Sequence, residues 1–135
     1  MIATSGVLHI TISVTDLDRA VAFYRDLLGC EVVERSAGTA SMRTGSAHFA
    51  LTSMPNHVPP NPAGPPDLWT TLFHHAFLVE PDEFDDALAQ LTQRGIAYYD
   101  CTPHGHSTFP GRRHVYIYDP DGNSVELTTR LPEDA

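Results

Sequence analysis

The chain has 135 residues, 41% of them hydrophobic and 19% charged, which is the composition of an ordinary globular domain. This length is enough to bury a core, so we expect one domain over residues 1–135. The formal net charge of −9 argues against a nucleic-acid backbone or an anionic membrane as partner. No apolar run is long enough to span a bilayer. Two isolated cysteines and the absence of a secretory segment favour a cytoplasmic protein.

The first half of the chain predicts a strand, a helix and three more strands. Residues 7–14 alternate between polar and apolar side chains, with His9 on the polar face, which is typical of a half-buried strand. Asp16 is expected to cap a helix that Gly29 ends. Three short strand-like runs follow at 31–35, 39–43 and 48–53. Together these elements form a first module over residues 6–54.

The next segment, residues 55–68, contains six prolines and is predicted to be a linker or surface loop. The pattern of the first half then repeats. His74 stands near the start of a strand over 72–79, as His9 does in the first module, and Pro81 is expected to open a helix that ends at Gly95. Further strands are predicted at 97–101, 114–118 and 124–129. This second module spans residues 70–130.

An internal repeat of this kind predicts an α+β fold in which two βαβββ modules form a curved mixed sheet around a metal-binding cleft. Strand alternation places His9, His74 and Glu126 on the faces that line the cleft. Each residue alone is as well explained by a structural hydrogen bond or an ion pair. Because they occur at equivalent positions of a repeat, we expect them to form a metal site. Two imidazoles and one carboxylate suit non-haem Fe(II), with Mn(II) or Zn(II) as alternatives.

Two stretches of the sequence resemble the vicinal oxygen chelate superfamily, which includes glyoxalases, fosfomycin and bleomycin resistance proteins and extradiol dioxygenases. They are LHITISVTDLDRAVAFYRDLLG at 8–29 and YIYDPDGNSVEL at 116–127. The resemblance covers nearly the whole chain except the proline-rich segment. It implies the fold strongly but no single reaction, because the superfamily performs many chemistries.

Departures from the family patterns narrow the choice of reaction. Glyoxalase I and methylmalonyl-CoA epimerase carry a fourth ligand at the position of Ala50, and alanine cannot bind a metal. Bleomycin-binding relatives usually lack the metal ligands, all of which are present in this sequence. The fosfomycin enzymes share the three-ligand pattern, but their phosphonate-binding and potassium-binding residues have no clear match.

The extradiol dioxygenases match this sequence better at three further positions. The resemblance implies that His48 is a proton acceptor, and that Tyr116 and His106 donate hydrogen bonds to the substrate. Tyr116 lies ten residues before Glu126, and His106 lies ten residues before Tyr116, one more than the family spacing. His48 and Tyr116 are also explained by ordinary structural roles. His104, His106 and His114 lie in or beside a Gly/Pro-rich loop, where exposed histidines are the usual case, and the same holds for His57.

These observations predict a ring-cleaving dioxygenase that uses Fe(II) and O2 on a catechol-type small molecule. One alternative is a metal-dependent isomerase, lyase or thiol transferase of the glyoxalase type. The other is a resistance protein that sequesters a small molecule. The resemblance also implies a homodimer.

Overall fold

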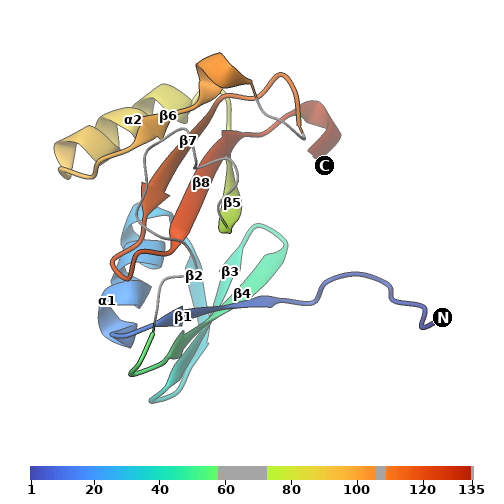
Figure 1. Ribbon diagram of the computed structural model, residues 1–135, viewed down its shortest axis with the longest axis vertical. Coiled ribbons are helices and arrows are strands. Elements are labelled where there is room, and N and C mark those ends of the chain that lie inside the picture. The colour runs from blue at the N-terminus through green and yellow to red at the C-terminus, as the bar shows by residue number, and fades with distance from the viewer. Residues whose placement is uncertain (58–72, 106–108, 135) are drawn as a thin grey trace. The chain divides into compact units, whose positions relative to one another are not determined.

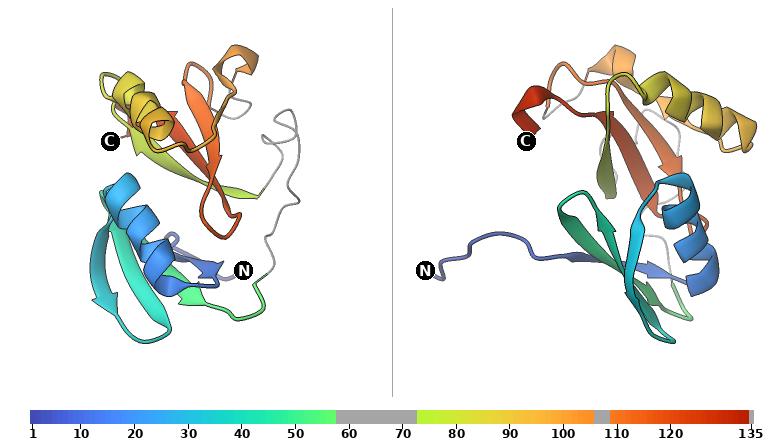
Figure 2. Two further views of the ribbon diagram at one scale, coloured as in Figure 1. Left: turned by 90° about the vertical axis from the view of Figure 1, so that its left-hand side faces the viewer. Right: turned by 180° about the vertical axis from the view of Figure 1, so that it is seen from behind.

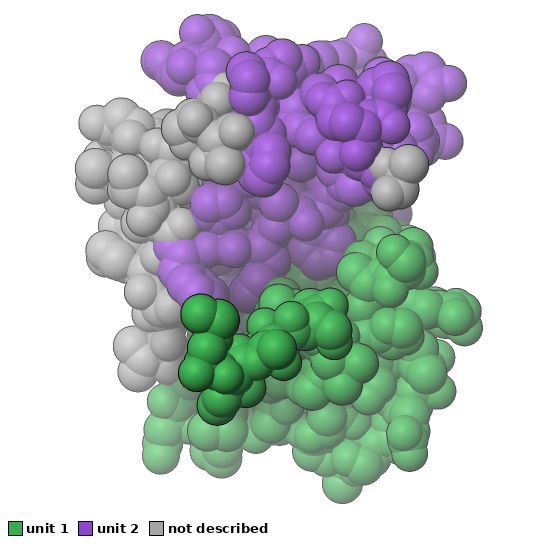
Figure 3. All heavy atoms as spheres, turned by 90° about the vertical axis from the view of Figure 1, so that its right-hand side faces the viewer, with its two compact units in different colours: residues 1–58 green, residues 59–135 purple. Residues whose placement is uncertain are grey.

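A computed structural model of the chain describes residues 1–57, 73–105 and 109–134 (Figure 1). The chain divides into two compact units, residues 1–58 and 59–135, which Figure 3 shows in different colours. Each unit carries its own four-stranded sheet. Among the described residues, no helix is long and apolar enough to cross a membrane.

Unit 1 is a βαβββ module whose strands lie in the order β1-β4-β3-β2. β1 pairs with β4 in parallel, and the other pairs are antiparallel. The residues before β1 are exposed, and the N-terminal end of the chain extends away from the sheet (Figure 1). The elements are β1 (Ile10–Val14), α1 (Leu17–Ala22), η1 (Phe23–Leu27), β2 (Glu31–Arg35), β3 (Thr39–Thr44) and β4 (Ala47–Ser53).

The helix of unit 1 covers the apolar face of its sheet (Figure 2). It starts where the Asp16 side chain accepts a hydrogen bond from the backbone N–H of Arg19, as expected of a helix cap. The last turns widen into a π-helix, and Gly29 ends the helix with a φ of +67°. Tyr24 is fully buried and lies against Phe49 of β4, with ring centroids 5.4 Å apart. This packing leaves the opposite, polar face of the sheet to carry functional side chains.

Unit 2 repeats the module with the strand order β5-β8-β7-β6. β5 and β8 are parallel, and the remaining pairs are antiparallel. The elements are β5 (His74–Val79), α2 (Phe84–Gln93), β6 (Tyr99–Asp100), η3 (Thr102–His104), β7 (His114–Tyr118), β8 (Ser124–Thr129) and η4 (Pro132–Asp134).

The core of unit 2 forms on one face of this sheet, where Val115, Ile117 and Val125 are fully buried. Phe84 of α2 is 1% exposed, and the guanidinium carbon of Arg113 lies 4.5 Å from the centre of its ring. This cation–π contact joins the start of α2 to the segment that leads into β7. The other face of the sheet therefore holds the side chains at alternate positions, including Glu126.

The predicted α+β class with two βαβββ modules is confirmed, with each module forming its own sheet. Several boundaries differ from the sequence prediction. β1 begins at Ile10 rather than at residue 7, so His9 precedes the strand. α2 begins at Phe84, because residues 81–83 form a turn and Pro81 does not open the helix. β6 is shorter than predicted, and most of the proline-rich segment 55–68 lies outside the described residues.

The buried Arg112 side chain hydrogen-bonds to the C-terminal segment of unit 2. Arg112 is 7% exposed and donates to the backbone oxygen of Thr129 at 2.7 Å and to Asp134 Oδ1 at 2.7 Å, with a second contact to Asp134 Oδ2. The backbone N–H of Leu131 also donates to Asp134. The Arg112 hydrogen bond is the main reason that the pKa of Asp134 falls to about 2.

We predict that Asp134→Asn lowers the melting temperature at pH 7, because it removes the negative charge that Arg112 binds. An Asp pKa is about 4 in an unfolded chain, so this stabilisation is present above pH 4. It disappears as the pH falls through the folded pKa of about 2. The gap between wild type and variant should therefore shrink when thermal unfolding is followed from pH 7 down to pH 3. A gap that stays constant over this range would show that the carboxylate charge plays no part.

Candidate metal and substrate site

The polar face of the unit 2 sheet carries the candidate site. Glu126 lies in the inner strand β8, opposite Ala76 of β5 on one side and Tyr116 of β7 on the other. Its exposure is 1%, so its carboxylate depends on neighbouring side chains for partners. His74 begins β5 and lies one step along the same face, opposite Ser124.

His74 and Glu126 are in direct contact. His74 Nε2 lies 2.9 Å from Glu126 Oε2, and His74 is 24% exposed whereas the carboxylate is buried. The two residues are diagonal neighbours in the β5–β8 register, because His74 lies opposite Ser124 and Glu126 lies opposite Ala76. Two of the three predicted metal ligands are thus brought together within one unit.

Tyr116 completes the surroundings of the carboxylate. Its ring meets that of His74 edge to face, with centroids 5.2 Å apart and an interplanar angle of 88°. Burial raises the pKa of Tyr116 well above its ordinary value, and the charge of Glu126 and a hydrogen bond to it act in the same direction. Tyr116 therefore stays protonated and acts as a hydrogen-bond donor on this face.

Cys101 lies beside Tyr116 and is 3% exposed. Burial raises the pKa of its thiol, and the charges of Asp100 and Glu126 add to the effect. Cys30 of unit 1 is also buried, which raises its pKa to about 11. Neither side chain is a thiolate at neutral pH, so neither is prepared to act as a nucleophile or a thiolate metal ligand.

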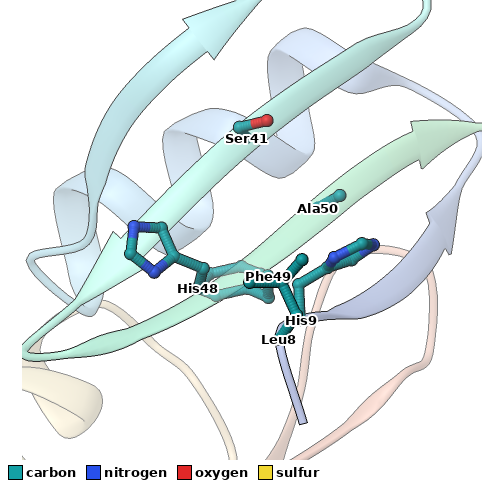
Figure 4. A pocket seen from close by; sticks show the side chains of 6 residues that line it. All are labelled: Leu8, His9, Ser41, His48, Phe49 and Ala50. Carbon is teal, nitrogen blue, oxygen red and sulfur yellow. The ribbon is translucent and has the colours of Figure 1, made fainter.

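A second candidate region is a pocket of about 280 Å³ on the polar side of the unit 1 sheet (Figure 4). It is lined by Leu8, His9, Ser41, His48, Phe49 and Ala50. His9 and His48 come from neighbouring segments, because Ile10 pairs with Phe49 in the β1–β4 register. The structure therefore brings the predicted metal ligand His9 and the predicted proton acceptor His48 into one pocket.

The described residues of each unit bring together no three His, Cys, Asp or Glu side chains in positions to hold a metal ion. His9 belongs to unit 1, whereas His74 and Glu126 belong to unit 2. The full three-ligand set therefore stays a prediction. The chemistry of the pair in unit 2 does fit a divalent metal, because an imidazole nitrogen and a carboxylate oxygen are both common ligands. Their separation of 2.9 Å is that of a direct hydrogen bond between the two side chains.

The four histidines that the sequence analysis expected to be exposed divide into three groups. His104 is exposed, as expected. The expectation of exposure is wrong for two histidines. His114, the first residue of β7, is completely buried, and His57 is half-buried. His57 Nδ1 lies 2.6 Å from the Ser13 hydroxyl. No local sequence pattern predicts this contact, because the two residues are 44 positions apart. His106 lies outside the described residues.

Comparison with known proteins agrees with this architecture. Residues 6–127 match the sequence profile of the Glyoxalase/Bleomycin resistance protein/Dioxygenase superfamily. The chain belongs to this superfamily. The resemblance stated from the sequence is confirmed at that level.

Among the superfamily members similar to this chain is the metallothiol transferase FosB of Lysinibacillus sphaericus (strain C3-41). It is 27% identical over 126 residues, which cover 93% of this chain and 83% of the relative. A solved glyoxalase/dioxygenase from Nostoc punctiforme is 28% identical with a TM-score of 0.70, covering 93% of this chain and 91% of that one. The fosfomycin resistance protein FosX of Listeria monocytogenes, solved with Mn(II) and sulfate, has a TM-score of 0.71 at 20% identity and covers 97% of each chain.

These relatives do not single out the extradiol dioxygenases. The FosB relative is named as a transferase, and the two solved relatives carry different activities in their names. The superfamily is therefore shown, and the reaction has to be argued from the residues of this chain.

We predict that neither cysteine reacts with a disulfide reagent such as Ellman's reagent in the folded protein at pH 8. Both thiols are buried, and both pKa values are raised by that burial. After unfolding in guanidinium chloride, both should react within seconds. Raising the pH toward 11 should increase the rate in the folded state. Rapid reaction of one thiol at pH 8 would contradict the buried, protonated state, and Cys30→Ser and Cys101→Ser would show which thiol reacted.

Proposed function

We propose that this protein is a metal-dependent enzyme that transfers a thiol to a small, oxygen-bearing electrophile. The observation that carries the proposal is the contact of His74 with the buried Glu126 carboxylate, which brings two side chains of metal-binding chemistry together on one face of a sheet. The similarity to a metallothiol transferase over 93% of the chain supports the choice of reaction.

In this proposal His74 and Glu126 hold a divalent metal together with His9. The ligand set of two nitrogens and one carboxylate oxygen would suit Mn(II) or Fe(II), with Zn(II) as an alternative. The bound metal would supply Lewis acidity toward an oxygen of the electrophile.

The remaining steps fall to side chains of this chain. The thiol sulfur forms a bond to the electrophilic carbon, and the carbon–oxygen bond breaks with its electron pair going to oxygen. We assign the thiol proton to His48, an exposed imidazole in the pocket of unit 1. We also assign a hydrogen bond to Tyr116: its protonated hydroxyl, which is hydrogen-bonded to Glu126 in this structure, would turn to donate to the oxygen as negative charge develops on it.

We predict that His74→Ala and Glu126→Gln each weaken Mn(II) binding by at least about a hundred-fold and abolish thiol transfer. His9→Ala should do the same if the three-ligand set is correct. Binding is measured by calorimetry, and transfer is measured with cysteine or glutathione against a panel of electrophiles that includes fosfomycin. His104→Gln is the control, because this histidine is exposed and outside the site. Wild-type metal affinity in the His74 and Glu126 variants would overturn the proposed site.

A ring-cleaving dioxygenase with Fe(II) and O2 is the second candidate. It is favoured by the presence of His48 in one pocket with His9, and by the 28% identity to the glyoxalase/dioxygenase of Nostoc punctiforme. In that reaction His48 would accept the proton of a catechol hydroxyl, with Tyr116 and His106 donating hydrogen bonds to the substrate. Oxygen uptake by Fe(II)-loaded protein with a panel of catechols distinguishes this reaction from thiol transfer, which consumes no oxygen.

Two further expectations stay proposals. The chain is expected to form a homodimer, which light scattering on the purified protein will test. Sequestration of a small molecule without turnover is the outcome to infer if the protein binds ligand stoichiometrically and no electrophile or catechol is consumed.

A further inference from the structure

Ser124 stands out among the buried polar side chains of β8 and the turn before it. It is 1% exposed, and its hydroxyl has no hydrogen-bond partner in the part of the chain that the structure describes. Two buried polar neighbours, by contrast, are satisfied. Asn123 donates to Asp119 at 2.8 Å, and the Thr128 hydroxyl donates to the backbone oxygen of Arg113 at 3.1 Å.

A buried hydroxyl without a partner destabilises a folded protein, so such groups are rare and call for an explanation. Packing volume does not explain this one, because alanine would fill nearly the same space without a polar atom to satisfy. The hydroxyl is therefore expected to find its partner in something that binds to the protein.

The position of Ser124 shows where such a partner would bind. Ser124 lies directly opposite His74 in the β5–β8 register and two residues before Glu126, so all three side chains share one face of the sheet. On its other side it lies opposite Tyr118 of β7. Glu126 is as fully buried as Ser124, and the more exposed His74 lies against it. A group that binds to His74 and Glu126 therefore lies on the same face of the sheet as Ser124, beside the strand position that Ser124 occupies.

We propose that Ser124 is a substrate-binding residue whose hydroxyl donates a hydrogen bond to an anionic oxygen of the small molecule bound at His74 and Glu126. This inference rests on the proposed metal site. The class of ligand follows from the chemistry of the face: a hydroxyl donor beside a metal-binding pair is complementary to an oxyanion such as a phosphonate, phosphate or carboxylate. Ser124 would then select for ligands that place such an oxygen next to His74.

The test compares wild type with Ser124→Ala, using Mn(II)-loaded protein and inorganic phosphate as the probe. Phosphate affinity is measured from the broadening of the ³¹P resonance by the bound Mn(II). We expect Ser124→Ala to bind phosphate about ten- to a hundred-fold more weakly, as for the loss of a hydrogen bond to a charged group. Mn(II) affinity should be unchanged, because Ser124 is not a ligand.

A second measurement separates ligand binding from a structural role. Since the hydroxyl has no partner to lose, the metal-free Ser124→Ala protein should melt at the same temperature as wild type or a few degrees higher. Thr128→Val on the same face is the matched control: it removes a hydroxyl that already donates to the backbone. It should lower the melting temperature and leave phosphate affinity as in wild type.

Each possible result has a different consequence. Equal phosphate affinity in wild type and Ser124→Ala would overturn the role of Ser124 while the proposed function stands. A large fall in the melting temperature of Ser124→Ala would show a structural role and also overturn the inference. If the wild-type protein binds no Mn(II), the proposed function fails, and the role of Ser124 fails with it.

Discussion

The candidate site depends on one constraint: a carboxylate buried in the middle of a sheet has to be paired. Glu126 occupies an inner strand of unit 2, where water does not reach it. The two adjoining strands supply its partners, His74 from β5 and Tyr116 from β7. The register of three strands thus gives a buried carboxylate its two side-chain partners.

The same surroundings determine the protonation of the neighbouring groups. Burial and the negative charge of Glu126 raise the pKa values of Tyr116 and Cys101, so both keep their protons. The face consequently presents one carboxylate among hydrogen-bond donors. In unit 1 the pocket around His9 presents two imidazoles and the hydroxyl of Ser41, without a carboxylate among its lining residues.

Membership of a large superfamily explains the fold of this chain but leaves its chemistry open. Relatives with the same architecture carry names as different as metallothiol transferase and glyoxalase/dioxygenase. The distinction must lie in a small number of side chains on the polar faces of the two sheets. In this chain the informative ones are His48, Ala50 and Ser124. Ala50 and His48 lie in the same strand and both line the unit 1 pocket.

The sequence by itself determined the two βαβββ modules, because strand and helix periodicities are local and occur twice. It also determined which face each strand residue occupies, since alternation along a strand fixes the faces of His74 and Glu126 once the strand is located. It failed at positions that depend on contacts distant in sequence. Pro81 looked like a helix start but lies in a turn, and His114 looked exposed but is buried by pairing with β8. Only the tertiary structure showed the 2.9 Å approach of His74 to Glu126, the shared pocket of His9 and His48, and the unsatisfied hydroxyl of Ser124. Each of these depends on the register between strands, and register is set by packing across the sheet rather than by any local pattern.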